Sequence, residues 1–186
     1  MNNLSKKIAS TLKTLRQEKG WSLDAASEKT GVSKAMLGQI ERGESSPTIA
    51  TLWKIISGFE VSFSTFVDPL PTIGAAKIHS GGDFKQLHPQ DDKILIKPLF
   101  AYDKALNFEM FIVELLPGCE HLSLPHPQGI IEHIVVVNGE MEVLADGNWQ
   151  HLKPKEGIRF NADQPHGYRN ISGLSAVFHN MIHYPK

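Results

Sequence analysis

The chain has 186 residues, enough for one large domain or two small ones, and its 41% hydrophobic and 21% charged residues are typical of a globular protein with a core. No apolar run approaches the ~18 residues of a membrane span, and the first twenty residues mix Leu and Ile with Lys, Ser and Thr. Cys119 is the only cysteine, which excludes an internal disulfide. These features predict a cytoplasmic protein without a membrane partner.

The net charge of −1 is unevenly distributed along the chain. Residues 1–68 carry 9 Lys and Arg against 7 Asp and Glu, whereas residues 69–186 carry 10 against 13. The N-terminal part is therefore weakly basic and is the better candidate for binding a polyanion such as DNA.

Residues 1–68 have the apolar spacing of short helices. In the first of these, Leu4, Ile8, Leu12 and Leu15 repeat every three or four residues, and Gly20 ends the pattern. Further helices are expected after the capping residues Ser22, Ser33 and Thr48. The expected helical segments are residues 4–19, 22–29, 33–42, 49–58 and a short element within 59–67.

The third helix has one apolar face and one polar face. Leu37 and Ile40 are expected to face the core, which leaves Lys34, Ala35, Gly38, Gln39 and Arg42 on the opposite surface. That surface offers hydrogen-bonding groups with little bulk, as the DNA major groove requires. An ordinary surface helix in a small bundle would have the same pattern, so the helix alone leaves both interpretations open.

The surrounding residues favour the first interpretation. The segments concerned are Leu15-Arg16, Gly20-Trp21-Ser22-Leu23, Thr30-Gly31-Val32-Ser33, Ile40-Glu41-Arg42-Gly43, Ser46-Pro47-Thr48 and Thr51-Leu52-Trp53-Lys54-Ile55. With them, residues 1–68 resemble the repressor-type helix-turn-helix domain of the xenobiotic-response-element family. The resemblance implies a five-helix DNA-binding domain and a structural pair between Arg16 and Glu41.

The same resemblance implies which side chains contact DNA. Base edges would be read by Lys34, Ala35 and Gln39, and phosphates would be contacted by Ser22, Ser33, Arg42 and Ser45. The chemistry agrees, because a Gln amide can bond adenine bidentately, an Ala methyl can contact thymine, and Ser hydroxyls suit phosphate oxygens. The alternative for Gln39 is a solvated side chain without a DNA contact.

A linker is expected at residues 69–82, where Pro69, Pro71 and three glycines break the helical pattern. From residue 83 to residue 186 the apolar period changes to two. Short strands are expected at residues 94–100, 108–116, 132–137, 140–145, 149–152, 157–160, 166–170 and 174–183. Such strands predict a sandwich or barrel, so the fold class is α+β with two domains, residues 1–68 and 83–186.

The strand-rich part resembles the cupin family of small jelly-roll barrels. The resemblance rests on Gly118, His126, Glu132 and Gly139, followed by His166 and Asn170. It implies a metal site of three histidines and one glutamate, but Leu124 stands at the first histidine position. Lys155, Asn161 and Asp163 also replace turn residues of the second family motif.

Three metal-ligating residues remain, namely His126, Glu132 and His166. Two imidazoles and a carboxylate can hold a divalent metal, for which zinc fits and iron(II) is also compatible. Because side chains alternate along a strand, Glu132 and His166 can both point into the barrel. The alternative is a metal-free barrel that binds a small organic ligand directly.

Other polar residues give further candidates. His121, His179 or His183 could replace the missing ligand, whereas His133 is expected to face away from the site and Cys119 to be a turn residue. Tyr102, Arg159 and Tyr168 are expected to line the barrel and bind an anionic or amino-acid-like effector. Arg159 could equally be a surface residue.

Together, the two domains resemble a bacterial regulator family in which the barrel senses a small molecule and the helical domain binds an operator. Residues 32–42, 51–55, 129–133 and 182–185 are similar to enterobacterial regulators of sulphur utilisation. The resemblance implies a non-enzymatic homodimer on a palindromic DNA operator, with an effector from sulphur or amino-acid metabolism. A DNA-tethered cupin enzyme and a constitutive repressor with an empty barrel are the alternatives.

Overall fold

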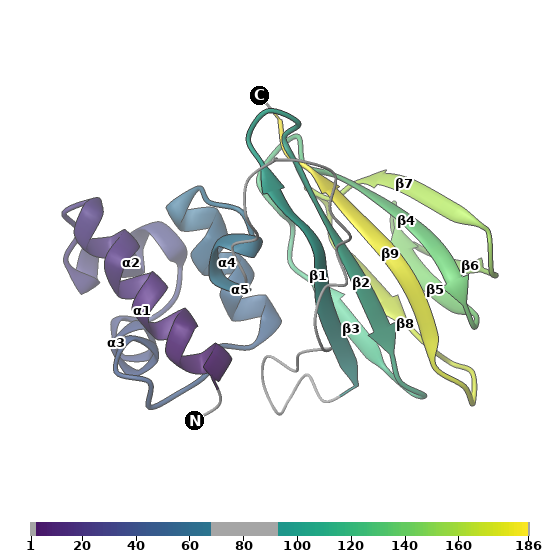
Figure 1. The fold of residues 1–186 in the computed structure, drawn as a ribbon, viewed down its shortest axis with the longest axis horizontal. Helices are drawn as coiled ribbons and strands as arrows, with labels where there is room; N and C mark the ends of the chain where they lie inside the picture. The colour runs from purple at the N-terminus through teal and green to yellow at the C-terminus, as the bar shows by residue number, and fades with distance from the viewer. Residues whose placement is uncertain (1–2, 68–92, 186) are drawn as a thin grey trace, which may run out of the picture. The chain divides into compact units, whose positions relative to one another are not determined.

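The computed structural model describes residues 3–67 and 93–185, which form a helical unit and a strand-rich unit (Figure 1). The expected linker at residues 69–82, and the domain boundary on each side of it, lie outside the described residues. Within the described ranges, no helix has the length and apolar character needed to cross a membrane.

The helical unit contains the expected succession of short helices. They are α1 (Asn3–Glu18), α2 (Leu23–Thr30), α3 (Lys34–Glu41), α4 (Ile49–Phe59) and α5 (Ser64–Val67). Ser22, Ser33 and Thr48 cap α2, α3 and α4, and each side chain accepts the backbone N–H three residues later. Gly31 ends α2 at a φ of 64°, a left-handed conformation that glycine adopts at low cost.

The core of the helical unit is built from the apolar faces of these helices. Its fully buried side chains include Ile8, Leu12, Leu37, Ile40, Leu52, Ile55, Ile56, Phe59 and Phe66. Each of them contributes about 1.5–3 kcal/mol through burial. Trp21 packs on Phe59 at a centroid distance of 4.9 Å, and Trp53 packs on Phe63 at 5.2 Å, so both indoles belong to the packing.

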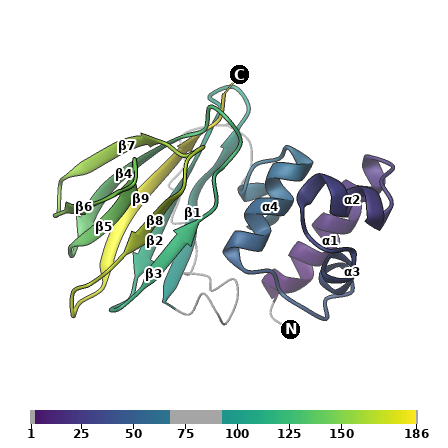
Figure 2. The ribbon, with the colours of Figure 1, turned by 180° about the vertical axis from the view of Figure 1, so that it is seen from behind.

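The strand-rich unit consists of two sheets that face each other (Figures 1 and 2). Its strands are β1 (Ile94–Asp103), β2 (Phe108–Leu115), β3 (Glu120–Ser123), β4 (Ile131–Asn138), β5 (Met141–Ala145), β6 (Asn148–Leu152), β7 (Gly157–Asn161), β8 (His166–Arg169) and β9 (Ala176–His183). The larger sheet has the order β1-β2-β9-β4-β7, and the smaller has the order β3-β8-β5-β6. Strand β3 was not expected, because it is short and contains no buried residue.

The inner faces of the two sheets form the second core. Phe111, Val113, Leu115, Ile134, Val136, Val143 and Phe178 are buried there. In the larger sheet, Glu132 of β4 is paired with Ile182 of β9 and with Phe160 of β7, so it lies in an apolar row. A buried carboxylate in such a row requires polar partners, and these partners define the candidate site.

The side chain of Asn170 connects two segments at one end of the barrel by hydrogen bonds. Its Nδ2 donates to the carbonyl oxygens of Leu115 and Leu174 at 2.9 and 2.7 Å, which ties the turn after β8 to the end of β2. Cys119 lies in the connection between β2 and β3 and is only 4% exposed. Its carbonyl accepts the backbone N–H of Asn170 at 2.9 Å, so Cys119 is part of the same closure.

Candidate functional site

Helix α3 presents the polar surface expected from the sequence. Leu37 and Ile40 are buried, whereas Lys34, Ala35 and Gln39 are exposed. Ser33 accepts the N–H of Met36 at 3.3 Å, so the serine fixes the beginning of the helix while remaining at the surface. Ser22 and Arg42 are also exposed and Ser45 is half-buried, so all seven residues implied for DNA contact reach solvent.

Gly38 departs from the prediction that it belongs to this free face. It is buried, and a Cβ at its position would lie 3.1 Å from Nη1 of Arg42 and 3.7 Å from Cδ1 of Leu23. Leu23 begins α2, so the prediction was wrong because the neighbouring helix covers this part of α3. The outward face therefore consists of Lys34, Ala35 and Gln39, with Arg42 at its end.

The expected pair between Arg16 and Glu41 is confirmed. Nε and Nη2 of Arg16 donate to the two carboxylate oxygens of Glu41 at 2.6 and 2.9 Å, and Nη1 donates to the carbonyl of Trp21 at 2.8 Å. The hydrogen bond to Glu41 raises the pKa of Arg16 above its already high value. With 16% and 8% of the side chains exposed, the pair joins α1 to α3 and helps to orient α3.

Two other ion pairs lie on the outward surface and were missed in the sequence. Lys34 Nζ is 2.8 Å from Oδ2 of Asp24, and Arg42 donates to both oxygens of Glu44 at 2.8 and 2.6 Å. The hydrogen bonds that Arg42 donates to Glu44 lower the pKa of the Glu44 carboxyl and raise the pKa of the Arg42 guanidinium. Asp24 gave no local signal because it lies ten residues before Lys34, on another helix.

Inside the barrel, three predicted metal-ligating residues meet. Nε2 of His126 is 3.0 Å from Oε1 of Glu132, and Nε2 of His166 is 3.6 Å from the same oxygen. All three side chains are buried, and one ligand atom from each lies within 4.8 Å of the others. His126 is held before β4 by its backbone N–H to Ala162, whereas Glu132 and His166 belong to β4 and β8.

Neighbouring groups orient Glu132 and His166. Tyr168 and Asn180 donate to Oε2 of Glu132, the latter at 3.1 Å, which leaves Oε1 facing the two imidazoles. Nδ1 of His166 donates to the carbonyl of Gln164 at 2.8 Å, so Nε2 carries the lone pair of the neutral ring. This is how proteins orient metal-bound histidines.

These residues fit a divalent cation. Among the described residues, Nε2 of His166 has no hydrogen-bond partner, although it is buried beside a carboxylate oxygen. Two lone pairs facing each other at 3.6 Å repel unless a proton or a cation lies between them. Ligands of tetrahedral zinc lie about 3.3 Å apart, and the distances of 3.0 and 3.6 Å bracket this separation.

The electrostatics of the cluster favour an ionised carboxylate. Burial would raise the pKa of Glu132, but the hydrogen bond and charge of His126, with the charge of His166 and the hydrogen bond from Tyr168, lower it to about 2. Burial lowers the pKa of His166, against the opposing effect of Glu132. Burial, followed by the charge of Glu132, raises the pKa of Tyr168 well above its usual value. The cluster therefore places an ionised carboxylate and a neutral phenol beside the two histidine rings.

Strand alternation excludes two of the proposed replacement ligands. His179 and His183 lie on the outer face of β9, because the alternating residues Phe178, Asn180 and Ile182 are buried. His121 does lie near the site, since its ring stacks on Tyr168 at a centroid distance of 6.3 Å and burial lowers its pKa to about 4. It is outside the three-residue group, and Leu124 is 43% exposed.

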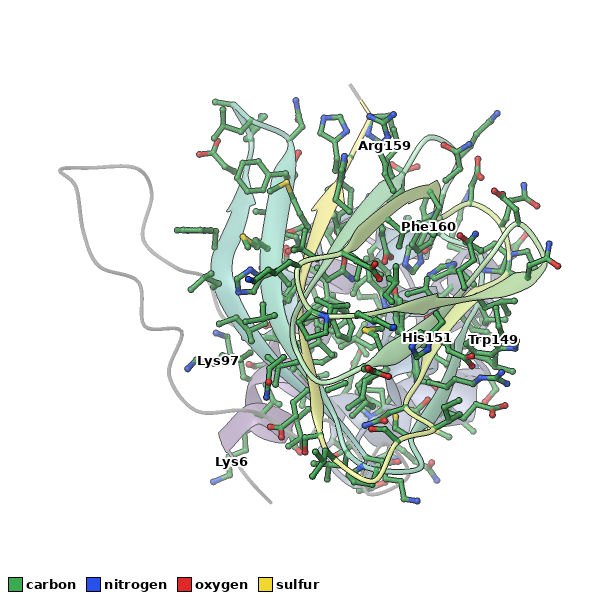
Figure 3. All side chains as sticks on the ribbon, turned by 90° about the vertical axis from the view of Figure 1, so that its right-hand side faces the viewer. Lys6, Lys97, Trp149, His151, Arg159 and Phe160 are labelled. Atoms are coloured by element: carbon green, nitrogen blue, oxygen red, sulfur yellow. The ribbon has the colours of Figure 1, made fainter. Side chains whose placement is uncertain are left out.

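The three residues predicted to bind an effector lie in different parts of the strand-rich unit. Arg159 does not line the barrel, because it is exposed beside the buried Phe160 (Figure 3). In the pairing of β4 with β7, Arg159 lies opposite His133, which alternates with the buried residues Glu132 and Ile134. Tyr102 donates to Oδ1 of Asn107 at 3.1 Å and packs on Tyr184. Neither of these two partners is a predicted metal ligand. Tyr168 does face inward, but its hydroxyl donates to Glu132.

Asn180 is the site residue that the sequence analysis missed. It lies in β9 between the buried residues Phe178 and Ile182, on the inner face of the sheet. A polar residue at an inward position of an apolar alternating strand was the signal that could have identified it.

Comparisons with known proteins match both units. Residues 12–66 match the family described as helix-turn-helix, and residues 111–182 match the family described as cupin domain. The chain is 48% identical over 186 residues to the HTH-type transcriptional regulator SutR of Escherichia coli (strain K12), which covers 100% of this chain and 99% of SutR.

Solved structures agree with this assignment. A crystal structure of an HTH_3 family transcriptional regulator from Vibrio cholerae has a TM-score of 0.85 and 47% identity, with 98% of each chain covered. The cupin domain of an XRE family transcriptional regulator from Enterobacter cloacae is also 47% identical, with a TM-score of 0.50 over 50% of this chain and 99% of that domain. The chain thus belongs to the helix-turn-helix transcriptional regulators that carry a cupin domain.

Proposed function

We propose that the protein binds a palindromic operator as a homodimer, with α3 of each copy in the major groove. The observation that carries this proposal is the outward face of α3, on which Lys34, Ala35 and Gln39 are exposed. The hydrogen bonds between Arg16 of α1 and Glu41 of α3 fix the position of this helix. Gln39 would bond an adenine bidentately, and Ala35 would contact a thymine methyl. The two copies would place their reading helices about one helical turn apart.

The phosphate contacts in this proposal come from the ends of the helices. Ser22 and Ser33 precede the N-termini of α2 and α3, where backbone N–H groups and the helix dipole favour an anion. Arg42 and Ser45 follow α3 and would contact the adjacent backbone. These contacts position the protein, whereas the base-edge contacts select the sequence.

Fluorescence anisotropy with duplexes from the protein's own promoter tests the DNA proposal. We expect saturable binding that weakens with salt and prefers one palindromic sequence. Gln39→Ala should lose about five- to hundredfold in operator affinity and little in affinity for unrelated DNA. Equal binding of operator and unrelated duplexes by the native protein would contradict the proposal.

We also propose that His126, Glu132 and His166 hold a divalent metal, with zinc as the best fit. The support is the buried lone pair of His166 beside Oε1 of Glu132 and the orientation of both groups by Gln164, Tyr168 and Asn180. A zinc ion held by three protein ligands keeps a position that can accept a carboxylate or similar group of an effector. The effector would be a small molecule of sulphur or amino-acid metabolism.

Elemental analysis of the purified protein tests the metal proposal. We expect close to one equivalent of metal per chain, with its loss after chelation and a lower melting temperature of the metal-free protein. His166→Gln should abolish retention of the metal, while His151→Gln, a change of an exposed histidine on β6, should not. A metal content in His166→Gln equal to that of the native protein would reject the site.

Binding at the barrel would regulate DNA binding only if the effector prefers one arrangement of the dimer. An effector with higher affinity for one arrangement shifts the population toward that arrangement. If effector binding changes the operator affinity by some factor, operator binding must change the effector affinity by the same factor. The proposal therefore predicts reciprocal effects in equilibrium titrations. Independence of the two affinities would indicate a regulator that is not controlled through the barrel.

A further inference from the structure

On the outward surface of the helical unit, two basic residues are each paired with an acidic residue of the same chain. Lys34 is paired with Asp24 at 2.8 Å, with 59% and 70% of the side chains exposed. Arg42 is paired with Glu44 at 2.6 Å, with 59% and 54% exposed. Lys34 and Arg42 are both among the residues proposed to contact DNA. Their positive charges are therefore already paired with carboxylates of the same chain.

These acidic residues are not explained by the stability of the fold. Exposed ion pairs are well solvated and contribute little to stability, whereas Arg16 and Glu41 form the less exposed pair that joins two helices. Asp24 also lies in the first turn of α2, where it interacts favourably with the helix dipole, but Glu44 follows α3 and has no such role. Two carboxylates on a surface that binds a polyanion instead oppose binding.

We propose that Asp24 and Glu44 act as internal counterions that limit sequence-independent DNA binding by Lys34 and Arg42. The inference rests on the proposed function, because it requires these two cations to lie at the DNA. A phosphate must displace each carboxylate, and the released carboxylate then lies in the negative field of the DNA. Sequence-independent binding derives essentially all its free energy from electrostatics, so it is the activity that these two residues reduce.

An internal counterion has a specific signature in salt titrations. A cation that neutralises a DNA phosphate releases counterions condensed on the DNA, and the salt slope becomes steeper with the number of phosphates neutralised. A cation that carries a carboxylate partner of its own chain neutralises less phosphate charge and releases fewer of these counterions. Removal of Asp24 or Glu44 should therefore strengthen binding and also make its salt dependence steeper.

The test compares Asp24→Asn, Glu44→Gln and the control Glu28→Gln by fluorescence anisotropy, with an operator duplex and an unrelated duplex over a range of salt concentrations. Glu28 is exposed on α2 one turn after Asp24, and within residues 3–67 the structure gives it no ion pair. We expect each of the first two variants to bind the unrelated duplex about three- to fivefold more tightly, with a salt slope steeper by up to about one ion. Glu28→Gln should change neither quantity by more than a small fraction of that.

A second variant distinguishes the pair from a general charge effect. In the Lys34→Met background, Asp24→Asn should no longer steepen the salt slope, because no lysine remains to be freed from its carboxylate partner. If the native protein prefers its operator but Asp24→Asn and Glu44→Gln retain native affinity and slope, the inference fails and the proposed function stands. Equal gains in Glu28→Gln would also overturn it. A native protein without operator preference would reject the proposed function itself.

Discussion

The two units use charged residues in opposite ways. In the helical unit, Lys34 and Arg42 form ion pairs that are more than half exposed, so water, salt or DNA can replace their partners. In the barrel, Glu132 is buried and its two oxygens face His126, His166, Tyr168 and Asn180. An exposed ion pair contributes little to stability, so its groups can exchange partners at low cost. A buried carboxylate is costly without polar partners, so its partners must be in place in the folded protein.

The largest effect is expected from Glu132→Ala. This change leaves the imidazole of His126, the hydroxyl of Tyr168 and the amide of Asn180 without their buried acceptor, so we expect a loss of about 3–5 kcal/mol in the free energy of unfolding. Chemical denaturation followed by far-UV circular dichroism measures it. Glu140→Gln, which removes an exposed carboxylate near His151, is the control and should change stability by less than about 0.5 kcal/mol.

A smaller loss of stability is expected on acidification of the metal-free protein. The pKa of Glu132 is about 2 in the folded protein against 4.5 for a free side chain, so the unfolded chain binds more protons in this range. The carboxylate therefore stabilises the fold above pH 4.5, and this contribution disappears as the pH falls toward 2. Glu132→Gln should flatten that part of the curve. An identical pH dependence in Glu132→Gln would show that other groups control acid unfolding.

Arg16→Met tests the same contrast within the helical unit. It leaves the carboxylate of Glu41, which is 8% exposed, without its bidentate partner, and we expect a loss of about 2 kcal/mol. Lys34→Met breaks an exposed pair and should cost less than about 0.5 kcal/mol. Thermal unfolding of both variants under the same conditions gives the comparison, and equal losses would show that exposure does not govern these pairs.

Gly38→Ala is expected to raise stability, by less than Arg16→Met lowers it. Alanine favours a helix by about 1 kcal/mol over glycine, and the nearest obstacle is Nη1 of Arg42 at 3.1 Å, the end of a flexible side chain. We therefore expect the free energy of unfolding to rise by up to about 1 kcal/mol. A clear loss would mean that Arg42 cannot move away, which would make its pair with Glu44 more rigid than its exposure suggests.

The parts of the fold that depend on neighbours in sequence could be predicted. The caps Ser22, Ser33 and Thr48, and the alternation that turns Glu132 inward, are local, so the helices and most strands follow from the sequence. Contacts between distant elements are not local. The pair of Arg16 and Glu41 was expected only through a family resemblance.

The errors at the site have the same physical origin. Gly38 was assigned to the free face because helical spacing does not reveal that Leu23 covers it. For Arg159 the sequence left both the barrel interior and the surface open, because alternation within β7 fixes only that Arg159 and Phe160 point in opposite directions. The register that pairs Phe160 with Glu132 decides which of them faces inward.

The burial of Cys119 has a practical consequence for spectroscopy. It is the only cysteine of the chain, and its 4% exposure protects the thiol from bulky labelling reagents. A cysteine introduced at an exposed position of α2 would then be the one readily labelled thiol, without removal of a native residue. Spin or fluorescent labels there could test the proposed homodimer by measuring the separation of the helical units of two copies in solution.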